Sequence, residues 1–157
     1  TTGTLAPIVS GTAVTASGTS VDFTNIPSWV KRITVMFSNV SLSGTDNVLV
    51  QLGDSGGVEN TGYVSISSQI ASSVTTASNT TGFLIQIGTA ARGLQGSMQI
   101  TLLSGNEWVQ SGTFNDGVGN TSCVSGSKTL SATLDRISIT RTGTNTFDAG
   151  TINILYE

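Results

Sequence analysis

A short alternating stretch constrains the fold of this chain more than any other feature. It lies within FTNIPSWVKRITVMF, residues 23–37, after the bend at Pro27. Because successive side chains of a β-strand project to opposite faces, a period of two predicts a strand with one face in the core. The predicted core face, Ile33, Val35 and Phe37, alternates with Arg32, Thr34 and Met36.

The same alternation recurs in short stretches along the chain. Clusters of Gly, Asn, Asp and Ser separate these stretches, and such residues are typical of turns. No helical period longer than a turn or two and no repeat of fixed length is present. The pattern predicts an all-β fold, an antiparallel β-sandwich of jelly-roll type with about eight to ten strands. The predicted strands are 20–24, 31–40, 47–52, 62–66, 82–87, 97–103, 107–114, 135–142 and 150–156.

Three longer polar segments are predicted to be loops. They cover residues 67–81, 88–96 and 115–127, and a Gly-rich turn covers residues 53–59. Serine, asparagine and glycine are frequent in them, as expected for turns and loops. For the first segment, a short helix over residues 69–74 is an alternative.

The beginning of the chain differs in composition from the rest. Residues 1–18 are rich in Thr, Ser, Gly and Ala and contain few apolar side chains. We therefore expect a linker to an upstream part of a longer chain. Residues 19–157 are predicted to form one β-sandwich domain, which is long enough to bury a core.

The composition excludes several kinds of site. The chain has 157 residues, no histidine, one cysteine (Cys123) and a net charge of −3. Without histidine, Ser-His-Asp and Cys-His catalytic arrangements cannot form, and zinc lacks its usual ligands. The six basic residues are scattered, whereas nucleic-acid binding needs clustered Lys and Arg. No apolar run approaches the roughly 20 residues of a membrane span. We expect no catalytic residue, metal, cofactor, nucleic-acid partner or membrane insertion.

The predicted turns and loops carry the candidate ligand-binding residues, since loops on a rigid scaffold commonly mediate recognition. Tyr63 follows the Gly-rich turn, and an exposed aromatic ring can stack on a sugar. Asp54 and Glu59 flank the same turn and could share a pocket, although acids at turns more often hydrogen-bond their own backbone. The candidate set is Tyr63, Asp54, Glu59, Arg92, Asn115 and Asp116.

Other residues are predicted to form the core or to lie on a second apolar surface. The core and scaffold set is Trp29, Ile33, Val35, Phe37, Trp108, Ile137 and Ile154. For Trp29, a place at the edge of the sandwich or between subunits is an alternative. Leu49, Leu84, Leu103, Val109 and Leu155 fall on the outward phase of their strands. Several apolar residues on that phase indicate further packing within the molecule or contact between subunits, and we favour a homo-oligomer.

Four stretches resemble one known family. They are FTNIPSWVKRITVMF (residues 23–37), VLVQLGDSGGVENTGY (48–63), LDRISIT (134–140) and TFDAGTINILYE (146–157). Together they are similar to the C-terminal domain of tail fibres and related tail proteins of tailed bacteriophages and prophages. The similarity extends over about residues 20–157, in blocks separated by divergent loops.

The resemblance implies a location and a set of partners. It implies an extracellular virion domain at the distal end of a tail fibre, assembled as a homotrimer and joined to an upstream fibre or tail protein. It also implies contact with a polysaccharide or lipopolysaccharide of the host surface. The family offers no catalytic motif to transfer, so we do not expect an enzyme.

Two other functions remain open from the sequence. The first is a structural virion module without a ligand, such as a capsid decoration, a baseplate part or a fibre cap. The second is a small polysaccharide depolymerase, which would use acids such as Asp54 and Glu59 as its pair of carboxylates.

Overall fold

The computed structural model describes residues 7–87, 89–90 and 92–157, and within them the chain forms strands, bends and turns but no helix. No described helix is therefore long and apolar enough to cross a bilayer. Nine of the described strands have six or more residues, in keeping with the predicted number. The strands are β1 (Val9–Ser10), β2 (Val14–Thr15), β3 (Val21–Phe23), β4 (Arg32–Leu42), β5 (Val48–Asp54), β6 (Gly57–Val58), β7 (Tyr63–Ile70), β8 (Val74–Asn79), β9 (Phe83–Ile85), β10 (Leu94–Ser104), β11 (Glu107–Asn115), β12 (Thr121–Thr129), β13 (Arg136–Arg141) and β14 (Phe147–Tyr156).

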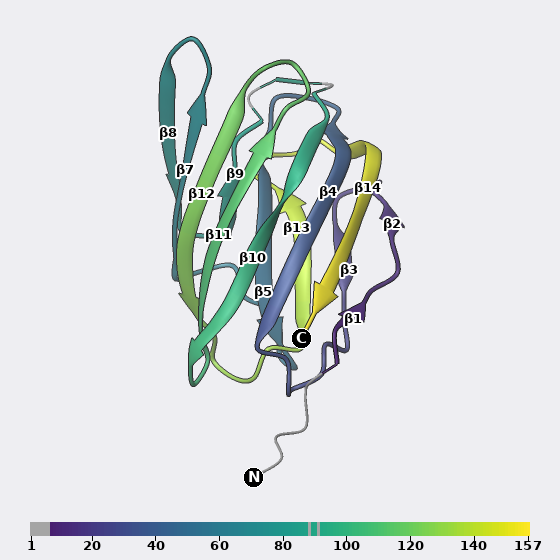
Figure 1. The fold of residues 1–157 in the computed structure, drawn as a ribbon, viewed down its shortest axis with the longest axis vertical. Helices are drawn as coiled ribbons and strands as arrows, with labels where there is room; N and C mark the ends of the chain where they lie inside the picture. The colour runs from purple at the N-terminus through teal and green to yellow at the C-terminus, as the bar shows by residue number, and fades with distance from the viewer. Residues whose placement is uncertain (1–6, 88, 91) are drawn as a thin grey trace.

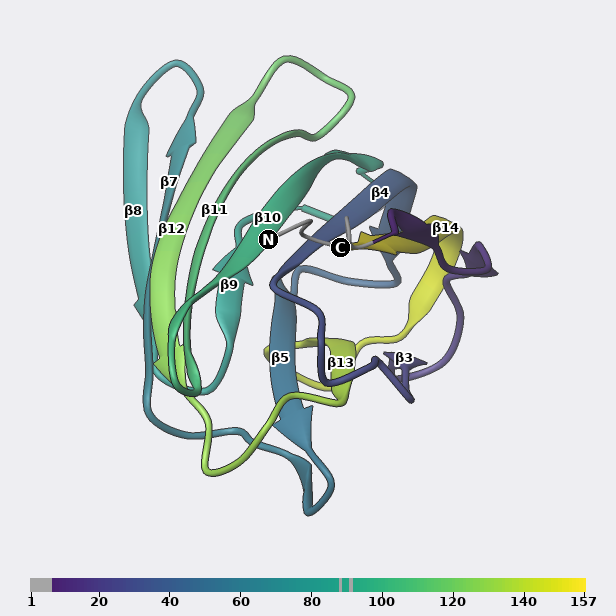
Figure 2. The same cartoon turned by 60° about the horizontal axis from the view of Figure 1, so that its bottom comes forward.

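The strands form two antiparallel sheets that pack against each other, so the predicted β-sandwich is confirmed (Figure 1). The large sheet has nine strands in the order β1-β14-β4-β10-β11-β12-β7-β8, with β2 also paired to β14. The small sheet has five strands in the order β3-β13-β5-β6, with β9 also paired to β5. Figure 2 shows the large sheet curling around the small one.

The pairing is nested in the manner of a jelly roll. Strand β4 pairs with β14 in the large sheet, β5 with β13 in the small sheet, and β7 with β12 in the large sheet again. Each pair thus encloses the next along the chain and alternates between sheets, as in a jelly roll. The hairpin β10–β11 is inserted between β4 and β12 in the large sheet.

The core lies between the two sheets and contains the alternating residues of β4. Phe37 packs edge-on against Phe114 of β11, with ring centroids 5.5 Å apart. Buried apolar side chains packed in this way supply most of the stabilisation of a sandwich. The core prediction is confirmed for Ile33, Val35, Phe37, Trp108, Ile137 and Ile154.

The core prediction is wrong for Trp29. Its side chain is 39% exposed and packs against Tyr156, with ring centroids 6.0 Å apart. Trp29 belongs to the turn between Pro27 and β4 and not to a strand, so no alternation directs it inward. It covers the end of β14, as the alternative of an edge position anticipated.

All three predicted loops contain strand residues. Residues 67–81 hold the second half of β7 and all of β8, joined by a turn at 71–73, so the alternative helix is also wrong. Residues 121–127 belong to β12. In the loop predicted over residues 88–96, β10 begins at Leu94, whereas Gly88 and Ala91 lie outside the described residues.

Inward-facing serine side chains explain why the second half of β7 and strand β12 escaped prediction. Ser65 and Ser67 of β7 face inward and accept hydrogen bonds from the backbone N–H groups of Leu84 (2.8 Å) and Gln86 (3.3 Å). The hydroxyl of Ser122 on β12 donates to the carbonyl of Gln86 (2.9 Å). Buried polar groups need such partners. The hydroxyls therefore join the large sheet to β9 and to Gln86, which follows it. In an ordinary strand, the inward-facing side chains at these positions would be apolar.

The five apolar residues predicted on the outward phase of their strands have different surroundings in the structure. Leu49 and Leu84 pair with each other across β5 and β9 and are buried. Leu155 is half-buried, whereas Leu103 and Val109 are exposed on the outer face of the large sheet. Part of the predicted second apolar surface is therefore used within the molecule, and part remains open to solvent.

The described part of the predicted linker packs against β14. Strands β1 and β2 both pair with β14, and the Gly11 N–H donates to the carbonyl of Ile154 (2.7 Å). Ala16 is buried in the core. Residues 1–6 lie outside the described residues, and the junction to an upstream part stays a prediction.

Candidate functional site

The candidate residues gather at two opposite ends of the sandwich. We call the end that carries Glu157 and the turn after Asp54 the proximal end, and the end that carries the 116–120 turn the distal end. Strand β12 runs from the distal end at Thr121 to the proximal end at Thr129 (Figure 1). Asp54, Glu59 and Tyr63 lie at the proximal end, whereas Arg92, Asn115 and Asp116 lie at the distal end.

At the proximal end, Ser131 joins Asp54 to Glu59. The Ser131 hydroxyl donates to Asp54 Oδ2 (2.6 Å), and the Ser131 backbone N–H donates to Glu59 Oε1 (2.7 Å). Glu59 Oε2 also pairs with Lys128 Nζ at 2.5 Å. These contacts connect the β5–β6 hairpin to the end of β12. The sequence correctly suggested that the two acids share a site, but nothing in it indicated Ser131 or Lys128.

Both acids of this pair have pKa values below their usual range. For Asp54, the hydrogen bond from the Ser131 hydroxyl is the main cause, followed by one from the Gly56 N–H. For Glu59, burial raises the pKa, but the hydrogen bonds from Lys128 and Ser131 outweigh burial. A glycosidase needs one carboxyl group whose pKa is raised so that it can act as the acid. Two stabilised carboxylates do not provide that acid.

Tyr63 is not an exposed sugar platform, so that prediction is wrong. Its ring is buried and packs edge-on against Phe83 at 5.1 Å. Its hydroxyl accepts a hydrogen bond from the Leu52 N–H (2.6 Å) and donates to the carbonyl of Glu59 (3.0 Å). Burial raises the pKa of Tyr63, which keeps the hydroxyl neutral. The ring points inward because Tyr63 shares the inner phase of β7 with Ser65.

Lys128 completes the proximal group and is an unusual residue in a core position. Its side chain is only 5% exposed, and Nζ lies 5.4 Å from the centroid of the Tyr63 ring. A buried ammonium needs a counter-ion, which Glu59 supplies. The group of Asp54, Glu59, Tyr63, Lys128 and Ser131 is thus internally paired and fastens the end of the sandwich.

At the distal end, Asp116 organises the turn between β11 and β12. Asp116 Oδ1 accepts hydrogen bonds from the backbone N–H groups of Val118 (3.1 Å) and Asn120 (3.0 Å). Asp116 Oδ2 accepts from the Asn120 side chain (2.7 Å) and from Arg92 Nη1 (2.5 Å). The ion pair joins two segments that are far apart in the sequence. We call Arg92, Asp116, Val118 and Asn120 the distal turn group.

The environment keeps Asp116 ionised. Burial raises its pKa, but the hydrogen bonds from the amides of Asn120 and Val118, the Asn120 side chain and Arg92 together lower it below its usual value. Asn115 is exposed, and its Oδ1 accepts from the Gly117 N–H (3.0 Å). The three predicted residues Arg92, Asn115 and Asp116 therefore do lie together, with one side of the turn facing solvent.

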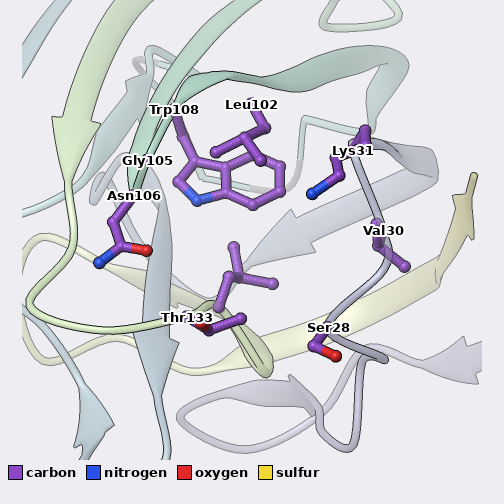
Figure 3. Close-up of a pocket in the computed structure, with 9 residues that line it drawn as sticks. Ser28, Val30, Lys31, Leu102, Gly105, Asn106, Trp108 and Thr133 are labelled. Atoms are coloured by element: carbon purple, nitrogen blue, oxygen red, sulfur yellow. The ribbon is translucent and has the colours of Figure 1, made fainter.

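A small cavity lies beside Trp108 at the proximal end (Figure 3). Its volume is about 90 Å³. Figure 3 shows the indole ring between Asn106 and Lys31, with Ser28 and Thr133 opposite it. Pockets that hold small ligands usually measure about 300 Å³ or more, so this cavity is too small for a sugar ring. Nothing in the sequence indicated this cavity, because Trp108 was predicted to lie in the core.

A shallow depression of about 410 Å³ adjoins this cavity. It is lined by Lys31, Arg32, Thr101, Leu102 and Glu157. Arg32 pairs with Glu157 there, so its charge is already compensated within the chain.

Among the described residues, no group of three or more His, Cys, Asp or Glu side chains is arranged to hold a metal ion. Comparisons of the chain with protein-family models, with curated proteins and with solved structures found no match.

Proposed function

We propose that the protein is a non-catalytic attachment domain of a phage tail fibre, which binds glycan on the host bacterial surface through its distal end. One observation carries the choice of this end. The distal turn group holds a polar turn in one conformation, at the opposite end of the sandwich from Glu157 and β1. An upstream fibre joined near β1 would therefore leave the distal turn pointing away from the virion.

The chemistry of the distal turn suits a neutral or acidic glycan. Arg92 uses Nη1 for Asp116, and its side chain is partly exposed, so other guanidinium N–H groups can reach a ligand. Asn115 is exposed beside it and offers an amide N–H₂ group to sugar hydroxyls. Because the backbone of the turn is already hydrogen-bonded, binding costs little ordering of the chain.

The resemblance of the four sequence stretches to phage tail-fibre domains supports this proposal over other binding functions. It adds a homotrimer, in which three equal sites act together. Linked weak sites gain avidity without new contacts, which suits the recognition of a repetitive polysaccharide. The protein would then be located at the virion surface, outside the cell.

Binding to bacterial surface glycans tests the proposal. The purified protein is applied to an array of capsular polysaccharides and lipopolysaccharides and to a panel of bacterial cells. We expect binding to a subset, and we expect Arg92→Ala and Asn115→Ala each to weaken it about tenfold, equivalent to about 1.4 kcal/mol. Asn106→Ala at the proximal cavity is the matched control and should bind like the unchanged protein.

Three results would overturn the proposal. One is the absence of binding to every glycan and cell by a folded, assembled protein, which would favour a structural virion module. Another is unchanged binding by both distal variants. The third is release of reducing ends from a bound polysaccharide, abolished by Asp54→Ala, which would make the protein a depolymerase.

A further inference from the structure

The outer face of β7 carries apolar side chains in place of the polar ones expected on a solvent-exposed strand. Val64, Ile66 and Ile70 on β7, with Val74 beside them on β8, are between 47% and 64% exposed. The register of β7 requires these apolar side chains to face outward. Ser65 and Ser67 hold the inward positions, because they accept hydrogen bonds from the backbone of Leu84 and Gln86. A slip of one residue would break those bonds.

The apolar residues continue into a face that carries no charge on β7, β8 and β12, and whose one charge on β11 is Glu107 at the proximal end of the strand. Across the sheet, Val64 lies opposite Ser127, which lies opposite Val109. In the next row, Ile66 lies opposite Ser125, which lies opposite Ser111. On β7, β8 and β12, all of whose residues are described, no outward-facing side chain is charged. The charged residue of β12, Lys128, is buried on the inner side.

The edge of this face is open. Strand β8 pairs with β7 on one side, and no described strand pairs with its other side. Its sequence, VTTASN, contains neither a charged residue nor a proline. Charges, prolines and bulges are the usual protection of a free edge, so an edge without them favours pairing with another chain.

We propose that the outer face of β7, β8, β11 and β12, together with the free edge of β8, is an interface with another copy of this chain. We call it the β8 face. The proposal deepens the homo-oligomer of the proposed function and rests on that function only for the number of copies. It does not depend on glycan binding.

The lack of charge selects a second copy over other occupants. The outward sides of β7, β8 and β12 carry no charge, so these parts of two copies meet without repulsion between like charges, whereas a charged partner would find no counter-ion there. A glycan would find neither an aromatic ring nor an amide on the outward side of these three strands, whose outward residues are Val, Ile, Ser, Thr and Cys. A surface of methyl and hydroxyl groups can pack against the same surface of a second copy.

The area is sufficient for a specific contact. Four strands spaced about 4.8 Å apart and about eight residues long, at roughly 3.4 Å per residue, cover about 500 Å². Two copies would bury about 1,000 Å² in total, which is the lower limit for a specific protein interface. Hydrogen bonds along the β8 edge would add to the contact.

The test combines mass and thiol reactivity. We expect light scattering to give a multiple of the 16.0 kDa chain mass for the unchanged protein. Ile66→Lys combined with Val109→Lys should give the single-chain mass, with an unchanged β-sheet circular dichroism spectrum. Val58→Lys is the matched control, because Val58 is an exposed valine on the small sheet, and it should leave the mass unchanged.

Cys123 supplies a second readout. It is the single cysteine of the chain and is exposed on the outward side of β12, opposite Ser68 of β7. In the assembled protein, a maleimide should modify Cys123 at least tenfold more slowly than in the double lysine variant. This measurement also applies if the lysine variant is poorly folded, because diluting the unchanged protein to its single-chain mass should expose the thiol equally.

The outcomes separate this proposal from the proposed function. A multimer that persists in the double lysine variant, with Cys123 fully reactive, overturns the β8 face but leaves the oligomer and the attachment function standing. An unchanged protein that is a single chain at all concentrations overturns the β8 face. Glycan binding by that single chain would still support attachment.

Discussion

Gln110 stands out among the buried residues, because its amide has no hydrogen-bond partner among the described residues. It faces inward on β11, opposite Ile100 on β10 and Gly126 on β12. Both Nε2 and Oε1 are buried and unpaired. Lys128, by contrast, brings a full charge into the interior but is compensated by Glu59. The cost of burial therefore depends on pairing more than on polarity, and Gln110 is the weaker position.

Replacing Gln110 by methionine tests this cost. Met has a similar length and no group that needs a hydrogen bond, so Gln110→Met should raise the free energy of unfolding by about 1 kcal/mol. Urea denaturation at neutral pH measures it. Gln99→Met, an exposed position on β10, is the control and should change the value by less than about 0.5 kcal/mol. A lower stability of Gln110→Met would contradict this cost of the unpaired amide.

Among the strands, β12 depends on the absence of a side chain at Gly126. A Cβ placed there would lie 2.2 Å from the carbonyl oxygen of Val64 and 3.2 Å from the Phe83 ring. On β11, a Cβ on Gly112, which pairs with Val124, would lie 2.7 Å from the Cβ of Met98. Glycines inside strands commonly mark such close approaches of the backbone. They allow the large sheet to curl closely around the small one (Figure 2).

We therefore expect Gly126→Ala to be strongly destabilising for its size. The added methyl group overlaps a backbone carbonyl that cannot move aside alone, so the free energy of unfolding should fall by about 2–3 kcal/mol. Chemical denaturation measures the change. Ser125→Ala, one residue away on the outer face, should cost less than about 0.5 kcal/mol. Equal stabilities of the two variants would mean that β7 and β12 separate easily at this point.

At the scale of the whole molecule, each end of the sandwich is fastened by carboxylates, of which Asp54 and Asp116 are buried and Glu59 is half-buried. Asp54 and Glu59 hold the proximal end through Ser131, and Asp116 holds the distal turn through Arg92 and Asn120. All three have lowered pKa values in the folded protein. They link segments that are distant in the sequence, so their protonation weakens the closure of the whole fold.

The stability of the protein should consequently fall in acid. A carboxylate whose pKa is lower in the folded than in the unfolded chain stabilises the fold above the unfolded value of about 4, and this contribution is lost as the pH falls through the folded value. We expect a melting temperature that is constant between about pH 7 and 5 and decreases below about pH 4.

The variant Asp116→Asn measures how much the distal end contributes to the pH dependence of stability. This variant should melt lower at pH 7 and lose less on acidification than the unchanged protein, as measured by calorimetry. Glu107→Gln, in the β10–β11 hairpin, is the carboxylate-to-amide control. A melting temperature that is independent of pH down to pH 3 would contradict the proposed role of these groups.

The sequence alone determined the fold class and most of the core. In residues 33–37 of β4, 137–139 of β13 and 152–156 of β14 every second residue is apolar, and this local pattern predicts both a strand and its buried face. It therefore identified Ile33, Val35, Phe37, Ile137 and Ile154 correctly. It also placed Arg92 and Asp116 in segments between strands, whereas Asn115 is the last residue of β11. These features depend on neighbours in the chain, which a sequence displays directly.

Only the tertiary structure decided the rest. In the second half of β7 and in β12, Ser67 and Ser122 hydrogen-bond the backbone of Gln86 and Gly126 closely approaches the backbone of Val64, and a local pattern of Ser, Thr and Gly carries no sign of those contacts. Tyr63 is buried because it shares the inner phase of β7 with Ser65, and Trp29 is half-exposed because it lies in the turn before β4. The contacts of Asp54 and Glu59 with Ser131 span more than 70 residues of chain, so folding alone brings them together.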